Sequence, residues 1–140
     1  MAPFAAPMRL VLDTNVLVSA LLHPGRTPDL ALVAARAAGA VVLVDARVEA
    51  EYREVLGRAK FKAVDPARRD ALLTAVLGSC ERVAVGEPST VALVDPDDRA
   101  FVDVALTGRA DAVVTGNGRH YPGTLGSAVL SPAELLARLT

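Results

Sequence analysis

The chain has 140 residues, of which 52% are hydrophobic, so it can bury a substantial core within one domain. Its 15 basic and 16 acidic residues give a net charge of -1, which excludes a protein that binds polyanions through its overall charge. Only 4% of the residues are aromatic, which argues against recognition of single strands by base stacking. Any nucleic-acid site must therefore be local.

The single cysteine, Cys80, excludes an intramolecular disulfide and a cluster of thiolate metal ligands. The first residues, MAPFAAP, lack the charged start and long apolar run of a signal peptide, and no apolar segment is long enough to span a bilayer. We therefore expect a cytoplasmic protein with no membrane partner. It should consist of a flexible tail over residues 1–8 and a single domain over residues 9–140.

Short apolar runs recur along the chain, separated by segments with helical periodicity. They predict strands at Leu10 to Leu12, Val41 to Val44, Val83 to Val85, Ala112 to Val114 and Ala128 to Leu130. Buried strands that alternate with helices are typical of a parallel sheet covered on both faces. The sequence thus predicts the α/β class, as a three-layer α/β/α sandwich with a central parallel sheet of about five strands.

Capping residues followed by proline predict helix starts at Thr27-Pro28, Asp65-Pro66, Asp95-Pro96 and Ser131-Pro132. Two glycines, Gly39 and Gly108, are expected where helices end. Ligands of open α/β sheets collect at the carboxyl ends of the strands. In this chain those ends carry the polar groups Asp13-Thr14-Asn15, Asp45 and Thr115-Gly116-Asn117.

The first of these groups stands inside the otherwise apolar stretch RLVLDTNVLVSALL, residues 9–22. An unpaired carboxylate costs free energy in such surroundings, so Asp13 needs a cap, a partner or a metal. Asp13, helped by Thr14, is a good N-cap for the helix that follows. The residues alone leave both the capping and the metal-binding interpretation open.

The stretch DPDDRAF, residues 95–101, has the acids and the proline of a helix start. Helical periodicity places Asp98 beside Phe101 and Ala105 on the inward stripe, and it places Asp103 on the opposite side. An inward carboxylate needs a partner. Asp98 is therefore the better functional candidate of the two.

The helix predicted over ARVEAEYREVLGRAKF, residues 46–61, offers further acids. Glu49 and Glu51 lie equally far from the centre of its apolar stripe, on opposite flanks, so periodicity cannot choose between them. Glu54 and Arg58 are expected to form an exposed i,i+4 pair. The basic residues around this helix are interspersed with acids, which fits a solvated helix pair at least as well as a phosphate-binding patch.

Four segments, VLDTNVLVSALL, EAEYREVLGRAKF, DPDDRAFVDVAL and ADAVVTGNGRHYP, resemble in order and spacing the motif series of PIN domains. They resemble in particular the bacterial branch that contains toxin components of toxin–antitoxin systems. The resemblance extends from Arg9 to Leu139. It implies a metal-dependent endoribonuclease that cleaves single-stranded RNA, with a cognate antitoxin as partner.

By position, the three acids of the family correspond to Asp13, Glu51 and Asp98, which the resemblance makes both catalytic residues and metal ligands. The choice of Glu51 over Glu49 rests on the resemblance alone. The fourth position often holds Asp in the family, and here it is Asn117, which the resemblance makes a catalytic residue without charge.

Carboxylate oxygens without a cysteine cluster favour Mg²⁺ or Mn²⁺ over zinc. Such an ion can hold a water for in-line attack on a phosphodiester. Thr14, Asn15 and Thr115 are expected to support the cluster. Arg119 and His120 are candidates for contacts with the substrate phosphate, although an ordinary surface loop explains them equally well.

A non-catalytic PIN-like module that binds RNA or protein is the alternative, because the chain lacks the fourth acid. We also expect self-association as a homodimer. The large share of apolar residues leaves hydrophobic surface that a second copy could cover, and the resemblance to the family also implies self-association.

Overall fold

The computed structural model describes residues 7–58 and 64–140, so residues 1–6 of the predicted tail and residues 59–61 of the helix predicted over residues 46–61 lie outside them. That helix ends earlier than predicted, at Leu56, with Gly57 as its C-cap. One five-stranded sheet has the order β3-β2-β1-β4-β5. Its strands, all paired in parallel, are β1 (Arg9–Leu12), β2 (Val41–Val44), β3 (Glu81–Arg82), β4 (Ala112–Val114) and β5 (Ala128–Leu130). The predicted parallel five-stranded sheet is confirmed.

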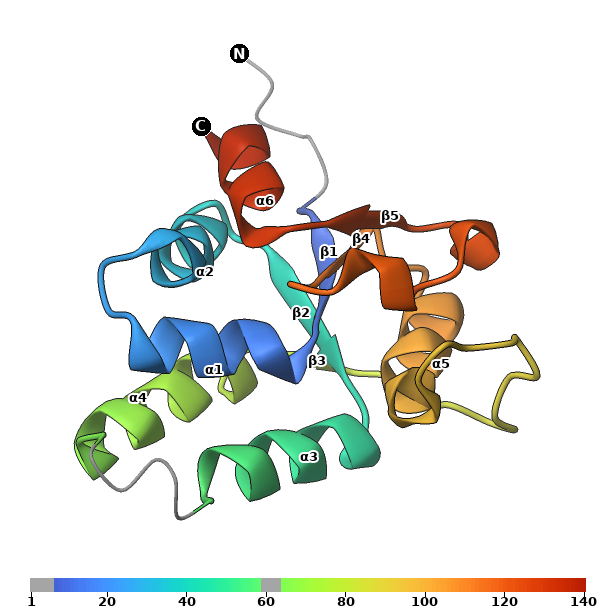
Figure 1. Ribbon diagram of the computed structural model, residues 1–140, viewed down its shortest axis with the longest axis horizontal. Helices are drawn as coiled ribbons and strands as arrows, with labels where there is room; N and C mark the ends of the chain where they lie inside the picture. The colour runs from blue at the N-terminus through green and yellow to red at the C-terminus, as the bar shows by residue number, and fades with distance from the viewer. Residues whose placement is uncertain (1–6, 59–63) are drawn as a thin grey trace.

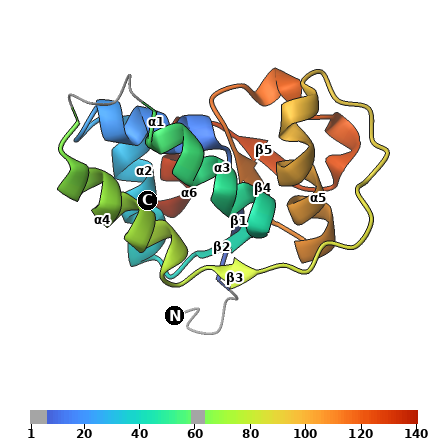
Figure 2. The ribbon, with the colours of Figure 1, turned by 90° about the horizontal axis from the view of Figure 1, so that it is seen from below.

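Helices cover both faces of this sheet, as expected because β2, β4 and β5 are apolar throughout and β1 is apolar from Leu10 to Leu12. The helices are α1 (Thr14–Leu22), α2 (Thr27–Ala37), α3 (Ala46–Leu56), α4 (Pro66–Leu77), α5 (Arg99–Gly108) and α6 (Pro132–Leu139). Figures 1 and 2 show α1, α2, α4 and α6 on one side of the sheet and α5 on the other, with α3 beyond the end of β2. None of the helices in the described ranges has the length and hydrophobicity to cross a bilayer.

The centre of the sheet is its most buried part. Leu10, Val11 and Leu12 of β1 are at most 1% exposed, and they pair with β2 on one side and β4 on the other. At this central position the polar residues that follow β1 and β4 are brought next to each other: the backbone amide of Asp13 donates to the carbonyl of Val114 (2.9 Å).

Three of the four predicted caps are confirmed, whereas Thr27 does not cap its helix: α2 begins at Thr27 itself, and its N-cap residue, Arg26, forms no side-chain cap hydrogen bond. The Asp65 carboxylate accepts from the amide of Ala67, and Ser131 forms a capping box with Glu134. The Asp95 carboxylate caps a short 3-10 helix, η2 (Pro96–Asp98), which leads directly into α5. Two further 3-10 helices, η3 (Gly118–His120) and η4 (Gly123–Leu125), lie between β4 and β5.

The predicted helix end at Gly108 is confirmed, because Gly108 is the last residue of α5 and Arg109 after it takes the left-handed conformation (φ 52°). A Cβ at Gly108 would lie 2.9 Å from Leu43 Cδ1 and 3.0 Å from Val83 Cγ2. Glycine therefore suits this position, because a larger residue would have to displace the side chains of Leu43 and Val83. Gly39, by contrast, follows α2 with a φ of 74°, as a helix-ending glycine should.

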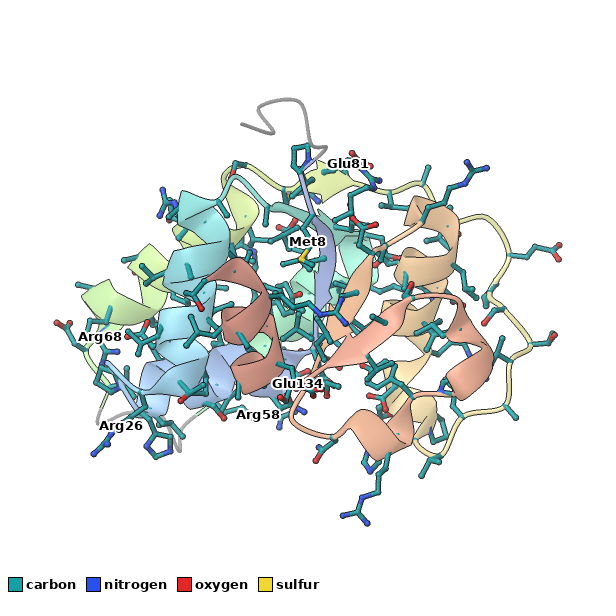
Figure 3. All side chains as sticks on the ribbon, turned by 90° about the horizontal axis from the view of Figure 1, so that it is seen from above. Met8, Arg26, Arg58, Arg68, Glu81 and Glu134 are labelled. Carbon is teal, nitrogen blue, oxygen red and sulfur yellow. The ribbon has the colours of Figure 1, made fainter. Side chains whose placement is uncertain are left out.

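The third strand lies two residues earlier than predicted, at Glu81–Arg82. The amide of Val83 still donates to the carbonyl of Val44 (2.8 Å), but its side chain packs against α5 at Gly108. Glu81 is held at the sheet edge by a bidentate ion pair with Arg9 (2.7 and 2.9 Å). Figure 3 labels Glu81 and Met8 at the end of the sheet where β1 begins. An exposed edge strand needs no apolar run, which explains the wrong boundary.

Candidate metal centre

An open, acidic pocket of about 360 Å³ lies at the carboxyl ends of β1 and β4. Its polar lining combines five carboxylates with one imidazole, one guanidinium and several neutral groups: Asp13, Thr14, Asn15, Glu51, Arg58, Asp95, Asp97, Asp98, Asn117 and His120. So many like charges in one place disfavour their own ionisation and favour a bound cation. The pocket is thus a candidate metal centre.

Asp13 is at the base of this pocket, where it is 8% exposed. Its Oδ1 accepts from the amide of Asn15 (3.2 Å) and caps α1. Its Oδ2 accepts from the hydroxyl groups of Thr115 (2.9 Å) and Tyr121 (3.0 Å). The two interpretations of Asp13 are therefore compatible, because the carboxylate caps the helix while it lines the acidic pocket.

The ends of β1 and β4 are joined by side chains rather than by the backbone ladder alone. Asn15 Nδ2 donates to Thr115 Oγ1 (3.3 Å), and Asn15 Oδ1 accepts from the amide of Gly116 (3.0 Å). The amide of Asn117 donates to Thr115 Oγ1 (3.0 Å). Asn15 and Thr115 thus fix both the orientation of Asp13 and the start of the loop that carries Asn117.

The structure distinguishes between the two glutamates of α3. Glu51 faces the pocket and accepts a hydrogen bond from the hydroxyl of Thr14, whereas Glu49 lies on the other flank in an ion pair with Arg82. Burial and the nearby charge of Asp13 raise the pKa of Glu51, although the hydrogen bond from Thr14 opposes the change. Of the two, only Glu51 is placed to act with Asp13.

Asp98 is 7% exposed at the end of η2. Its Oδ2 is buried and has no hydrogen-bond partner among residues 7–58 and 64–140. Burial, followed by the like charges of Asp13 and Asp95, raises the pKa of Asp98 to about 6, with His120 acting in the opposite direction. A carboxylate oxygen in this state is poorly stabilised by the protein and well placed to bind a cation.

The closest grouping in the pocket differs from the predicted one. Within the described part of the chain, the possible metal ligands whose ligand atoms all lie within 4.8 Å of one another are those of Asp95, Asp98 and His120. Asp13 and Glu51 line the same pocket without belonging to this group. The sequence interpretation had treated Asp95 only as a helix cap, a role that it also fulfils through the amide of Asp97 (2.9 Å).

Some residues of the loop after β4 line the pocket, and others lie on the surface outside it. Asn117 and His120 line the pocket, whereas Arg119 is exposed and is not among the lining residues. Arg58 also lines the pocket, although its guanidinium forms the predicted i,i+4 pair with Glu54 (3.1 Å). The structure therefore adds Arg58 to the cations that a bound polyanion could meet.

Tyr121 is the residue that sequence reasoning missed. It is 6% exposed and donates its hydroxyl hydrogen bond to Asp13, and burial together with that carboxylate raises its pKa. The sequence offered only a chemical signal: a buried tyrosine hydroxyl needs a hydrogen-bond partner, and Asp13, in its apolar stretch, needs one as well.

Asp103 corrects the interpretation of α5. It lies away from the pocket, as predicted, but it is 2% exposed rather than on the surface. Its Oδ1 accepts from the amide of Ser89 (2.9 Å) and its Oδ2 from Arg47 (3.0 Å), because the connection from β3 to η2 covers this side of the helix. Asp45, at the end of β2, caps α3 and pairs with Arg47 and is not a lining residue of the pocket.

Comparison with known proteins agrees with this architecture. A chain in the crystal structure of VapBC2 from Rickettsia felis, bound to a DNA fragment from their promoter, matches this chain with a TM-score of 0.57 and 18% identity. The match covers 89% of this chain and 98% of that chain. No curated protein matches the sequence. A family model described as a PIN domain matches residues 9–119.

Proposed function

The chain belongs to the PIN-domain family, and from that membership we propose that it is a metal-dependent endoribonuclease that hydrolyses phosphodiester bonds of single-stranded RNA. Proteins of this family are generally nucleases that use divalent cations. The observation that carries the proposal is the acidic pocket at the end of β1 and β4, where a buried carboxylate oxygen of Asp98 lacks a partner among the described residues.

The residues of the pocket fit a hard divalent cation such as Mg²⁺ or Mn²⁺. We assign Asp13, Glu51 and Asp98 as its ligands, because all three offer carboxylate oxygens in one pocket from which cysteine is absent. When bound, the cation supplies an activated water and neutralises the charge that develops on the phosphate. Burial raises the pKa values of Glu51 and Asp98, and repulsion from neighbouring carboxylates adds to the effect; the charge of the cation would relieve this repulsion.

The remaining residues of the proposed site orient and bind. Tyr121 and Thr115 hold Asp13 in one rotamer by donating to the same oxygen. Asn117 is exposed at the pocket, where its amide can orient the attacking water or coordinate through oxygen without adding charge. We assign contacts with the RNA phosphates to two side chains of the loop after β4, the guanidinium of Arg119 and the imidazole of His120.

We further propose that this nuclease is the toxin of a toxin–antitoxin pair that acts in the cytoplasm. The likeness to a chain of the VapBC2 structure supports this proposal. Exposed apolar side chains on α2, Leu30 (46%) and Val33 (61%), beside an apolar pocket of about 350 Å³ between α1, α2 and α4, offer surface for a protein partner. An antitoxin and a second copy of this chain are the partners that we propose.

The test is an RNA cleavage assay on the purified full chain. We expect cleavage of single-stranded RNA with Mg²⁺ or Mn²⁺, loss of cleavage with EDTA, and loss in Asp13→Asn. Asp70→Asn is the matched control, because Asp70 lies exposed on α4. Cleavage that continues in EDTA would contradict the proposal. RNA binding without cleavage in the unmodified chain would instead support the non-catalytic PIN-like module.

The toxin role has a separate test. A short upstream reading frame that encodes a DNA-binding antitoxin, whose product blocks cleavage when added to this chain, would support it. Light scattering measures the dimer: a monomer at tens of micromolar protein would contradict self-association.

A further inference from the structure

Three side chains with metal-binding atoms meet on one side of the acidic pocket. Asp95 precedes η2, Asp98 ends it, and His120 ends η3, so two separate loops contribute. The ligand atoms of all three lie within 4.8 Å of one another. Such spacing is compatible with one shared ion, because two ligands that are each about 2.0–2.2 Å from a metal lie roughly 3–4.4 Å apart.

The contact between His120 and Asp98 is not a hydrogen bond. Nδ1 of His120 lies 3.7 Å from Oδ2 of Asp98, which is beyond hydrogen-bond distance. A distance of this size is what two ligands of one cation show. The imidazole therefore lies close enough to share an ion with the carboxylate and too far to satisfy it directly.

The second observation is the state of Asp98 itself. Its side chain is 10% exposed, and Oδ2, the atom that faces the imidazole, has no hydrogen-bond partner in the described part of the chain. Buried polar atoms are nearly always paired, so this oxygen requires a partner that the chain does not supply.

The backbone holds the other two residues in place. Asp95 Oδ1 accepts from the amide of Asp97 (2.9 Å), which fixes the orientation of the carboxylate. The amide of His120 donates to the carbonyl of Asn117 (2.9 Å) and closes the turn that carries the imidazole. A carboxylate that is already oriented, as that of Asp95 is, loses little conformational freedom on binding.

We propose that Asp95, Asp98 and His120 bind a first-row transition-metal dication, with the imidazole of His120 as its nitrogen ligand. An imidazole ligand favours ions such as Mn²⁺, Co²⁺ or Zn²⁺ over Mg²⁺, which prefers oxygen and keeps much of its hydration. This site shares Asp98 with the ligand set proposed above, Asp13, Glu51 and Asp98. Asp95 and His120 do not belong to that set. A role of this site in catalysis rests on the proposed nuclease function. Binding of the ion at this site does not depend on that function.

The test measures metal binding rather than activity. The full chain is titrated with MnCl₂, CoCl₂ and MgCl₂ by calorimetry, and the Co²⁺ complex is followed by its visible absorption. We expect His120→Gln to weaken Mn²⁺ and Co²⁺ binding by about tenfold or more and to change Mg²⁺ binding by no more than about twofold. The matched control is His23→Gln, because His23 is the other of the two histidines and is exposed at the end of α1.

A second pair of variants guards against an indirect effect. Asp95→Asn should weaken Mn²⁺ and Co²⁺ binding as His120→Gln does, and Asp70→Asn should leave it unchanged. Circular dichroism checks that each variant is folded. Binding of Mn²⁺ and Co²⁺ that is the same in His120→Gln as in the unmodified chain overturns the inference, as does an equal loss of Mg²⁺ affinity.

These results are separable from the proposed function. Selective loss of transition-metal binding in a chain that never cleaves RNA would support the site and contradict the nuclease. Metal-dependent RNA cleavage by a chain whose Mn²⁺ and Co²⁺ affinities do not respond to His120→Gln would support the nuclease and overturn the site.

Discussion

Asp98, at the start of α5, and Asp103, within it, are almost equally buried but differ in their hydrogen bonds and pKa values. Asp98 is 7% exposed and Asp103 is 2% exposed. Both oxygens of Asp103 accept hydrogen bonds, from the amide of Ser89 and the guanidinium of Arg47. Oδ2 of Asp98 has no such partner within the described residues.

The same contrast appears in the pKa values. Burial raises the pKa of Asp98 to about 6, and neighbouring carboxylates add to the effect. Burial also acts to raise the pKa of Asp103, but the hydrogen bonds from Ser89 and the ion pair with Arg47 bring it below its usual value. Burial alone therefore does not mark a functional carboxylate, because what matters is whether the protein itself satisfies the charge.

The largest expected difference is in RNA cleavage. Asp98→Asn should lower the rate by about 100-fold or more, since loss of a proposed metal ligand should exceed the 10- to 100-fold effects typical of groups that only support one. Asp103→Asn should keep cleavage within a few-fold at a temperature where the variant is folded. Initial rates at saturating Mn²⁺ measure both, and equal losses in the two variants would contradict the distinction between the aspartates.

The order reverses for stability without metal. Asp103→Ala should lower the free energy of unfolding by about 2–4 kcal/mol, because it leaves the Ser89 amide and Arg47 without their buried acceptor. Asp98→Asn should raise it by roughly 1–2 kcal/mol, since it removes a charge that burial and like charges disfavour. Urea unfolding in EDTA measures both changes. A loss of stability in Asp98→Asn would show that the carboxylate is satisfied in a way that the structure does not contain.

The parts of the fold that the sequence predicts well are those where burial dictates the residue types. β4 begins and ends at the predicted residues because all three of its residues are buried between β1 and β5, and β5 does so, although it is an edge strand, because its apolar residues pack against the core. β3 consists of Glu81 and Arg82 at the exposed edge, where no apolar pattern is required. The apolar run over residues 83–85 marks packing of the β3–η2 connection instead, as Val83 shows at Gly108.

The residues of the candidate site also differ in how well the sequence predicts them. Periodicity identifies Asp98 because its inward direction depends only on the helix that it begins. It also places Asp103 correctly on the side away from the pocket, but it cannot predict that this residue is buried, because the segment that covers it comes from a connection without regular structure, at Ser89. Tyr121 and the grouping of Asp95 with His120 depend on how two loops meet, and no pattern within either loop encodes that meeting.

A smaller effect is expected in the pH dependence of stability. The folded-state pKa of Asp98 is raised to about 6, so its protonation contributes stability that is complete below its unfolded pKa of about 4 and is lost as pH rises through 6. The pKa of Asp103 is lowered, so its contribution is present above about pH 4 and is lost only in more acidic solution.

Thermal unfolding in EDTA between pH 4 and pH 8 separates the two. The excess stability of Asp98→Asn over the unmodified chain should shrink as the pH falls from 8 towards 5, by about 1–2 kcal/mol. The deficit of Asp103→Asn should stay constant over that range. An excess for Asp98→Asn that does not depend on pH would mean that removal of the charge is not its cause.

The smallest expected effect concerns the tyrosines that hold the end of β1. Tyr121 donates to Oδ2 of Asp13 (3.0 Å), and Tyr52 donates to the backbone carbonyl of Leu12 (2.5 Å) one residue earlier. Each substitution by phenylalanine removes one buried hydrogen bond and should cost about 1 kcal/mol of stability. Only Tyr121→Phe leaves a carboxylate oxygen of the pocket less satisfied, which makes Asp13 resemble Asp98 more and Asp103 less. Tyr121→Phe should weaken Mg²⁺ binding, measured by calorimetry, by about tenfold, because the carboxylate of Asp13 is then less firmly oriented, while Tyr52→Phe should leave the affinity unaltered. Equal affinities in the two variants would mean that Thr115 alone fixes the carboxylate, because its hydroxyl donates to the same oxygen at 2.9 Å.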